Sequence, residues 1–140
     1  MQTVFSGPAG PRFLDEVREA PGAKAGDLLT AALYRVLSAD GEVSADAADR
    51  ALVAVMLLLV EQAPEVVDDA PDPDGLRAYL ADLDTELTPA RITAAQGVLG
   101  RLLVPSANAW SDAHERAGTL AAAQQDVRSL AELLADADNG

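Results

Sequence analysis

An uninterrupted apolar segment, Ala51 to Val60, constrains the fold of this chain more than any other feature. Its ten residues are bounded by Arg50 and Glu61, so the segment is about half as long as a membrane-spanning helix must be. Alanine, leucine and methionine favour a helix, and a helix that is apolar on every side has to be surrounded by other elements. We therefore expect a central buried helix over about residues 45–62.

The rest of the chain is predicted to form shorter helices, because apolar residues recur at helical spacing and proline or glycine separates the segments. The expected helices cover about residues 12–19, 25–38, 45–62, 75–83, 89–104, 107–117 and 119–136. The predicted fold class is all-α, as a single compact bundle of six or seven short helices around the central one. Residues 1–10 are expected to form an irregular N-terminal arm, 11–136 a single domain and 137–140 a frayed tail.

Helix boundaries are indicated by capping residues. Ser44, Thr88 and Ser106 each precede a helical pattern and are predicted N-caps; Pro89 after Thr88 strengthens the second of these. Gly118 is expected to end the sixth helix.

The composition excludes several classes of function. Acidic residues outnumber basic ones 23 to 10, a net charge of −13, which disfavours binding to nucleic acid. Cysteine is absent, so disulfides, thiol catalysis and thiolate metal sites are excluded, and a single histidine leaves little for acid–base chemistry. We expect no catalytic residue, no cofactor and no metal, and hence a protein that is not an enzyme.

The first residues lack the basic and apolar regions of a secretory signal, and no apolar run is long enough for a membrane span. A cytoplasmic protein without membrane contact is expected.

Residues 61–86, the acidic segment, contain nine carboxylates and one basic residue, Arg77. Such a concentration of charge favours encounter with a basic protein, although acidic surfaces also simply keep helical proteins in solution. The spacing does not match a calcium-binding loop, since Ala70 and Ala81 fall where carboxylates are required. The candidate partner-binding residues are Glu61, Glu65, Asp68, Asp69, Asp72, Asp74, Tyr79 and Trp110.

Trp110 and His114 lie one helical turn apart on the same face of a predicted helix. Packing within the bundle and a role for Trp110 as an interface anchor both fit this spacing. Binding of a small molecule would require a pocket lined by both residues and by buried carboxylates. The last helix has an apolar stripe, which either packs on the bundle or pairs two copies into a homodimer.

Several segments resemble an uncharacterised bacterial family. They are Phe13-Leu14-Asp15-Glu16-Val17 after Gly7-Pro8, the Ala/Leu-rich helix from Asp46 to Leu59, and Ile92 to Leu103 followed by Ser106-Ala107-Asn108-Ala109-Trp110. The family is domain of unknown function 4259. Its Trp-Gly and Asn-Asp elements are replaced here by Val4-Phe5 and Ala9-Gly10-Pro11. The resemblance implies a small, acidic, helical protein and no particular activity.

The functional expectation is a non-enzymatic acidic binding protein, most concretely an immunity-type or regulatory inhibitor that covers a basic site on a partner protein. Two alternatives are a structural module that associates with itself through the last helix and, less favoured, a helical binder of small molecules.

Overall fold

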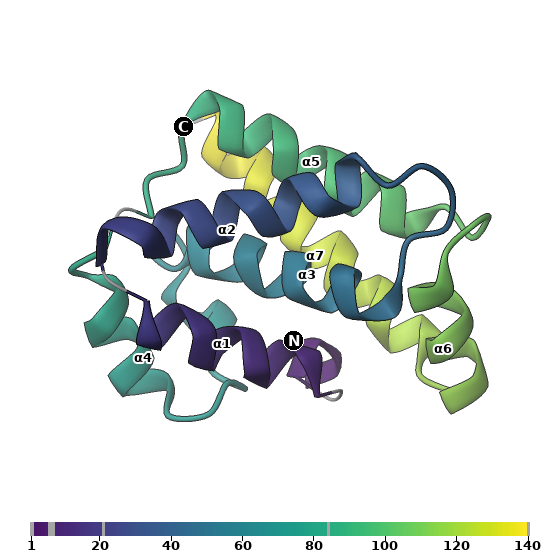
Figure 1. The fold of residues 1–140 in the computed structure, drawn as a ribbon, viewed down its shortest axis with the longest axis horizontal. Helices are drawn as coiled ribbons and strands as arrows, with labels where there is room; N and C mark the ends of the chain where they lie inside the picture. Colours follow the sequence, from purple (N-terminus) through teal and green to yellow (C-terminus); the bar gives the residue numbers. More distant parts are fainter. Residues whose placement is uncertain (1, 6–7, 21, 84, 140) are drawn as a thin grey trace.

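The computed structural model describes residues 2–5, 8–20, 22–83 and 85–139. Within these ranges the chain forms seven α-helices, two short 3₁₀ helices and no strand, which confirms the all-α bundle (Figure 1). The elements are η1 (Gln2–Phe5), α1 (Ala9–Glu19), α2 (Gly22–Leu37), α3 (Ala45–Leu59), η2 (Pro64–Val67), α4 (Pro73–Leu80), α5 (Pro89–Leu103), α6 (Ala109–Ala117) and α7 (Leu120–Asn139). No described helix has both the length and the apolar character needed to cross a membrane.

Helix α3 is the centre of the bundle, as its sequence predicts. Every residue from Ala51 to Leu59 is at most 1% exposed. Helices α1, α2, α5, α6 and α7 all contact α3, and Figure 1 shows α3 running between α1 and α2. The predicted N-cap is confirmed, because the Ser44 hydroxyl accepts a hydrogen bond from the Ala47 N–H at 3.1 Å. The helix ends at Leu59, slightly earlier than expected.

Arg50 joins α3 to α1. Its guanidinium donates two hydrogen bonds to the Glu16 carboxylate, at 2.9 and 3.1 Å, and lies 4.8 Å from the centre of the Phe13 ring. Arg50, the last polar residue before the apolar run, therefore keeps its charged group near the surface while its side chain packs on Phe13.

The apolar stripe of α7 faces the bundle. Its members are Ala123, Val127, Leu130 and Leu134, all fully buried. Helix α7 packs against α5, α3, α6 and η1. The stripe is therefore used inside the fold, which leaves it unavailable as a seam between two copies in this conformation.

The N-terminal segment differs from the predicted irregular arm. Residues 2–5 form η1, with Val4 buried, and α1 begins at Ala9 rather than near Arg12. Gly10 lies so close to the Val4 carbonyl that a side chain there would collide with it, which explains how the arm folds back. Residues 6 and 7 lie outside the described residues, as does Gly140; the expected frayed tail is helical through Asn139.

The N-cap of α6 is Asn108 and not Ser106, which corrects the prediction. The Asn108 side chain accepts from the Ser111 N–H at 3.0 Å and donates to the carbonyls of Leu102 and Val104 at 2.9 and 3.1 Å. An isolated backbone bridge to Val43 holds the same residue. Asn108 is buried and satisfies polar groups at the end of α5 and the start of α6 together, whereas Ser106 is exposed.

We expect Asn108→Ala to lower the free energy of unfolding by about 2–3 kcal/mol, because it removes a cap and leaves two carbonyls without their donor. Ser106→Ala, the matched change two residues earlier, should stay within about 0.5 kcal/mol of the wild type. Urea denaturation followed by circular dichroism measures both. Equal effects of the two substitutions would contradict the assignment of the cap.

Candidate functional site

The acidic segment folds around α4 at one end of the molecule. Figure 1 shows α4 beside the C-terminal part of α1, at the opposite end from α6. The acidic residues of this segment that the structure describes are all exposed: Glu61, Glu65, Asp68, Asp69, Asp72, Asp74, Asp82 and Glu86. Asp84 lies outside the described residues. The fold therefore presents this charge to solvent on one small unit.

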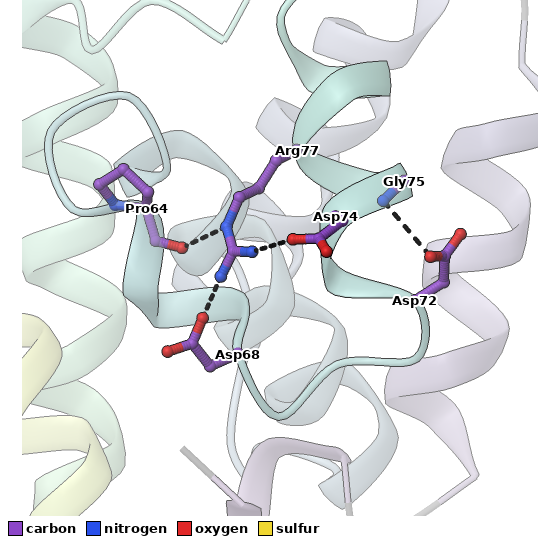
Figure 2. Close-up of polar contacts among 6 residues, drawn as sticks. All are labelled: Pro64, Asp68, Asp72, Asp74, Gly75 and Arg77. Atoms are coloured by element: carbon purple, nitrogen blue, oxygen red, sulfur yellow. Dashed lines mark hydrogen bonds and ion pairs between the residues drawn. The ribbon is translucent and has the colours of Figure 1, made fainter.

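Arg77, the single basic residue of the segment, is engaged by its own neighbours (Figure 2). Its guanidinium donates to the Pro64 carbonyl and to the Asp74 carboxylate, each at 3.0 Å, and also pairs with Asp68. The arginine thus ties η2 to α4. Its single positive charge is shared between the Asp68 and Asp74 carboxylates.

Asp72 has a structural role as the N-cap of α4. Its carboxylate accepts from the Gly75 N–H at 3.4 Å, and its backbone is left-handed, with φ of 50° (Figure 2). A side chain at Gly75 would collide with this carboxylate, so glycine is required there for the cap to form as it does.

The apolar side of the same unit attaches it to the bundle. Leu76 and Leu80 of α4 are buried, and the Tyr79 hydroxyl donates to the Val17 carbonyl of α1 at 2.8 Å. Tyr79 is half-buried and is therefore committed mainly to the contact with α1. A hollow of about 420 Å³ lies beside α4, lined by Val60 and Leu80 and by other residues that include Glu61 and Arg77.

The structure does not bring Trp110 to the acidic segment. Trp110 lies on α6, at the opposite end of the molecule, and is only 1% exposed (Figure 1). It cannot serve as a surface anchor beside the acidic residues in this conformation, which corrects its place in the predicted set.

Trp110 instead lines a second hollow, of about 300 Å³, between α3 and α6. We call it the Asp49 pocket; its polar lining residues are Asp49, Trp110, His114 and Thr119, and its other lining residues are alanines. The Trp110 and His114 rings meet edge to face, with centres 4.9 Å apart. His114 Nδ1 lies 2.8 Å from the Thr119 hydroxyl oxygen, which fixes the imidazole ring.

The electrostatics of the Asp49 pocket are unusual. Burial raises the pKa of the Asp49 carboxyl to about 7; the neighbouring Trp110 N–H opposes this rise and the charge of Asp46 adds to it. Burial also lowers the pKa of His114, against the influence of Asp126. Among the described residues, neither Asp49 Oδ1 nor Trp110 Nε1 has a partner in hydrogen-bonding geometry. The pocket thus contains a hydrogen-bond acceptor, Asp49 Oδ1, and a donor, Trp110 Nε1, for which the fold supplies no partner.

Sequence reasoning missed Asp49 altogether. It precedes the apolar run as an ordinary polar residue near a helix start, and only the packing of α6 onto α3 buries it. In the part of the chain that the structure describes, no group of three or more histidine or acidic side chains is placed to share a metal ion.

No family model, no curated protein and no solved structure matches the chain. The resemblance to domain of unknown function 4259 stays a prediction, and no functional residue is transferred from it.

The raised pKa of Asp49 predicts a specific pH dependence of stability. Between about pH 4 and pH 7 the folded state keeps a proton that the unfolded state has released, so Asp49 makes the free energy of unfolding fall as pH rises through this window. Asp49→Asn cannot ionise. Its stability advantage over the wild type should grow from near zero at about pH 4 to about 1–3 kcal/mol above pH 7, allowing for solvent around the partly exposed carboxyl.

Urea denaturation at several pH values measures this difference. Asp40→Asn removes an exposed carboxylate that does not act on Asp49 and serves as the control. An advantage of Asp49→Asn that is constant across the pH range would show that Asp49 is not protonated in the folded protein.

Proposed function

We propose that this chain is a non-enzymatic cytoplasmic binding protein whose acidic segment covers a basic site on a partner protein. The observation that supports this most directly is the exposure of all eight described carboxylates of the segment, beside a single arginine that is held by its neighbours. An immunity-type or regulatory inhibitor in a bacterium is the most concrete form of the proposal.

The physics of such a surface favours fast association. A net charge of −13, with much of it on one small unit, raises the rate of encounter with a basic protein and orients the approach. The hollow beside α4 would add apolar contact area next to the charges, through Val60 and Leu80. Charge would thus determine the rate of association, and burial of apolar atoms would determine the lifetime of the complex.

Self-association through α7 is the alternative function, and the packing of α7 supports it less than it supports binding to another protein. The apolar stripe of α7 is buried against the rest of the bundle, so a homodimer built on it would require α7 to detach. Exposed large apolar side chains among the described residues are Tyr34, Leu37 and Val104, and only Tyr34 and Val104 are about half exposed.

The test of the acidic surface should avoid carboxylates with structural roles. Asp68 and Asp74 pair with Arg77, and Asp72 caps α4, so their loss would disturb the fold as well as the charge. The variant Glu61→Gln, Glu65→Gln, Asp82→Asn removes three exposed charges of the acidic segment. The matched control Asp40→Asn, Glu42→Gln, Glu115→Gln removes three exposed charges from the α2–α3 connection and α6, at the other end of the molecule (Figure 1).

We expect a tagged chain to retain a basic protein from a lysate of its own host at low salt and to lose it at high salt. With the purified partner, the acidic-segment variant should associate at least about tenfold more slowly than the wild type, and the control variant should associate at nearly the wild-type rate. Stopped-flow or surface-plasmon kinetics at two salt concentrations measure these rates. Equal rates for both variants, or association that salt does not affect, would refute the proposal.

A further inference from the structure

Asp49 lies in the second turn of α3 with most of its carboxyl group buried, and no described residue forms an ion pair with it. A buried carboxylate without a nearby cation is unfavourable, because it loses hydration and gains no opposite charge. Trp110 supplies an N–H beside the carboxyl group but no charge. Asp46, on the next turn of the same helix, makes the local potential more negative still.

The other polar groups of the pocket do not provide the missing charge. Burial disfavours the charged form of His114, and its Nδ1 is engaged with the Thr119 hydroxyl. Asp126 of α7 acts on His114 and is itself hydrogen-bonded to Thr3. The groups of α3 and α6 that act on the carboxyl or line the pocket therefore leave it with neutral or negative surroundings.

The walls of the pocket suit an organic group. Three alanines, Ala45, Ala113 and Ala117, line it with methyl groups, and the His114 ring, packed on the buried Trp110 ring, adds aromatic surface. A volume of about 300 Å³ lies at the small end of the range for pockets that bind small molecules. A metal ion would find one carboxylate and one imidazole here, which is too few ligands, whereas a primary amine needs one acceptor and an apolar enclosure.

We propose that the Asp49 pocket binds a small primary amine, with the ammonium group on the Asp49 carboxylate and the hydrocarbon body against the His114 ring and the alanines. The ammonium supplies the positive charge that the fold omits, and the Asp49 carboxylate accepts a hydrogen bond from it. The Thr119 hydroxyl oxygen is a further acceptor at the pocket wall. This site lies at the opposite end of the molecule from α4 and is independent of the proposed protein partner (Figure 1).

Trp110 is the only tryptophan of the chain, so its fluorescence reports directly on this pocket. The probe is cyclohexylamine, with cyclohexanol as the neutral analogue of the same size. We expect cyclohexylamine to change the fluorescence saturably, with a dissociation constant of about 1 mM, and cyclohexanol to bind at least about tenfold more weakly.

Two variants locate the site. Asp49→Asn should weaken binding of cyclohexylamine at least about tenfold, while Asp46→Asn, which removes the same charge one turn away, should bind within about threefold of the wild type. Ala117→Leu keeps every charge and fills the pocket, so it should also weaken binding at least about tenfold.

Binding requires ionised Asp49, so affinity for cyclohexylamine should rise about tenfold between about pH 6 and pH 8, and Asp49→Asn should abolish this dependence. Equal affinity for the amine and the alcohol, wild-type affinity in Asp49→Asn or Ala117→Leu, or no saturable response to cyclohexylamine up to about 20 mM would each overturn the proposal.

Discussion

The complete burial of α3 is the constraint on which the rest of the structure depends. From Ala51 to Leu59 the helix has no polar side, so every direction around it must be covered by another helix. Helices α1, α2, α5, α6 and α7 each contribute an apolar side to that cover. The middle of α3 is enclosed, and the two hollows described above lie where its cover ends: the Asp49 pocket at its N-terminal end and the hollow beside α4, lined by Val60, at its C-terminal end.

The two ends of the molecule differ in where their carboxylates lie. Around α4 the basic residue of the acidic segment, Arg77, is held by Pro64, Asp68 and Asp74, and the described carboxylates of the segment are exposed at the surface. Beside α6 a single carboxyl, that of Asp49, is withdrawn from water without a cation. Surface carboxylates act at long range and suit encounter with a large basic partner, whereas a buried carboxyl acts only on what enters its pocket.

Features set by neighbouring residues could be predicted from the sequence. The N-caps Ser44 and Thr88 and the left-handed Gly118 are confirmed, because a cap is made within one turn of its helix. The close approach of Leu37 to Gly97 joins two different helices, and no pattern within either helix distinguishes Gly97 from Gly100, which has open space around it. Asn108 displaced Ser106 as a cap because its partners include carbonyls of the preceding helix and a bridge to Val43, none of which a local pattern reveals.

The sequence by itself determined the helical class, the central position of α3 and the strong negative charge of residues 61–86, because periodicity, propensity and charge are properties of short segments. Only the tertiary structure decided which side chains share a site. It buried Trp110 beside Asp49, far from the acidic segment, and it turned Tyr79 toward α1. The physical reason is that the apolar pattern of each helix determines which of its own faces is buried. Which other helix covers that face depends on the packing of all the helices together.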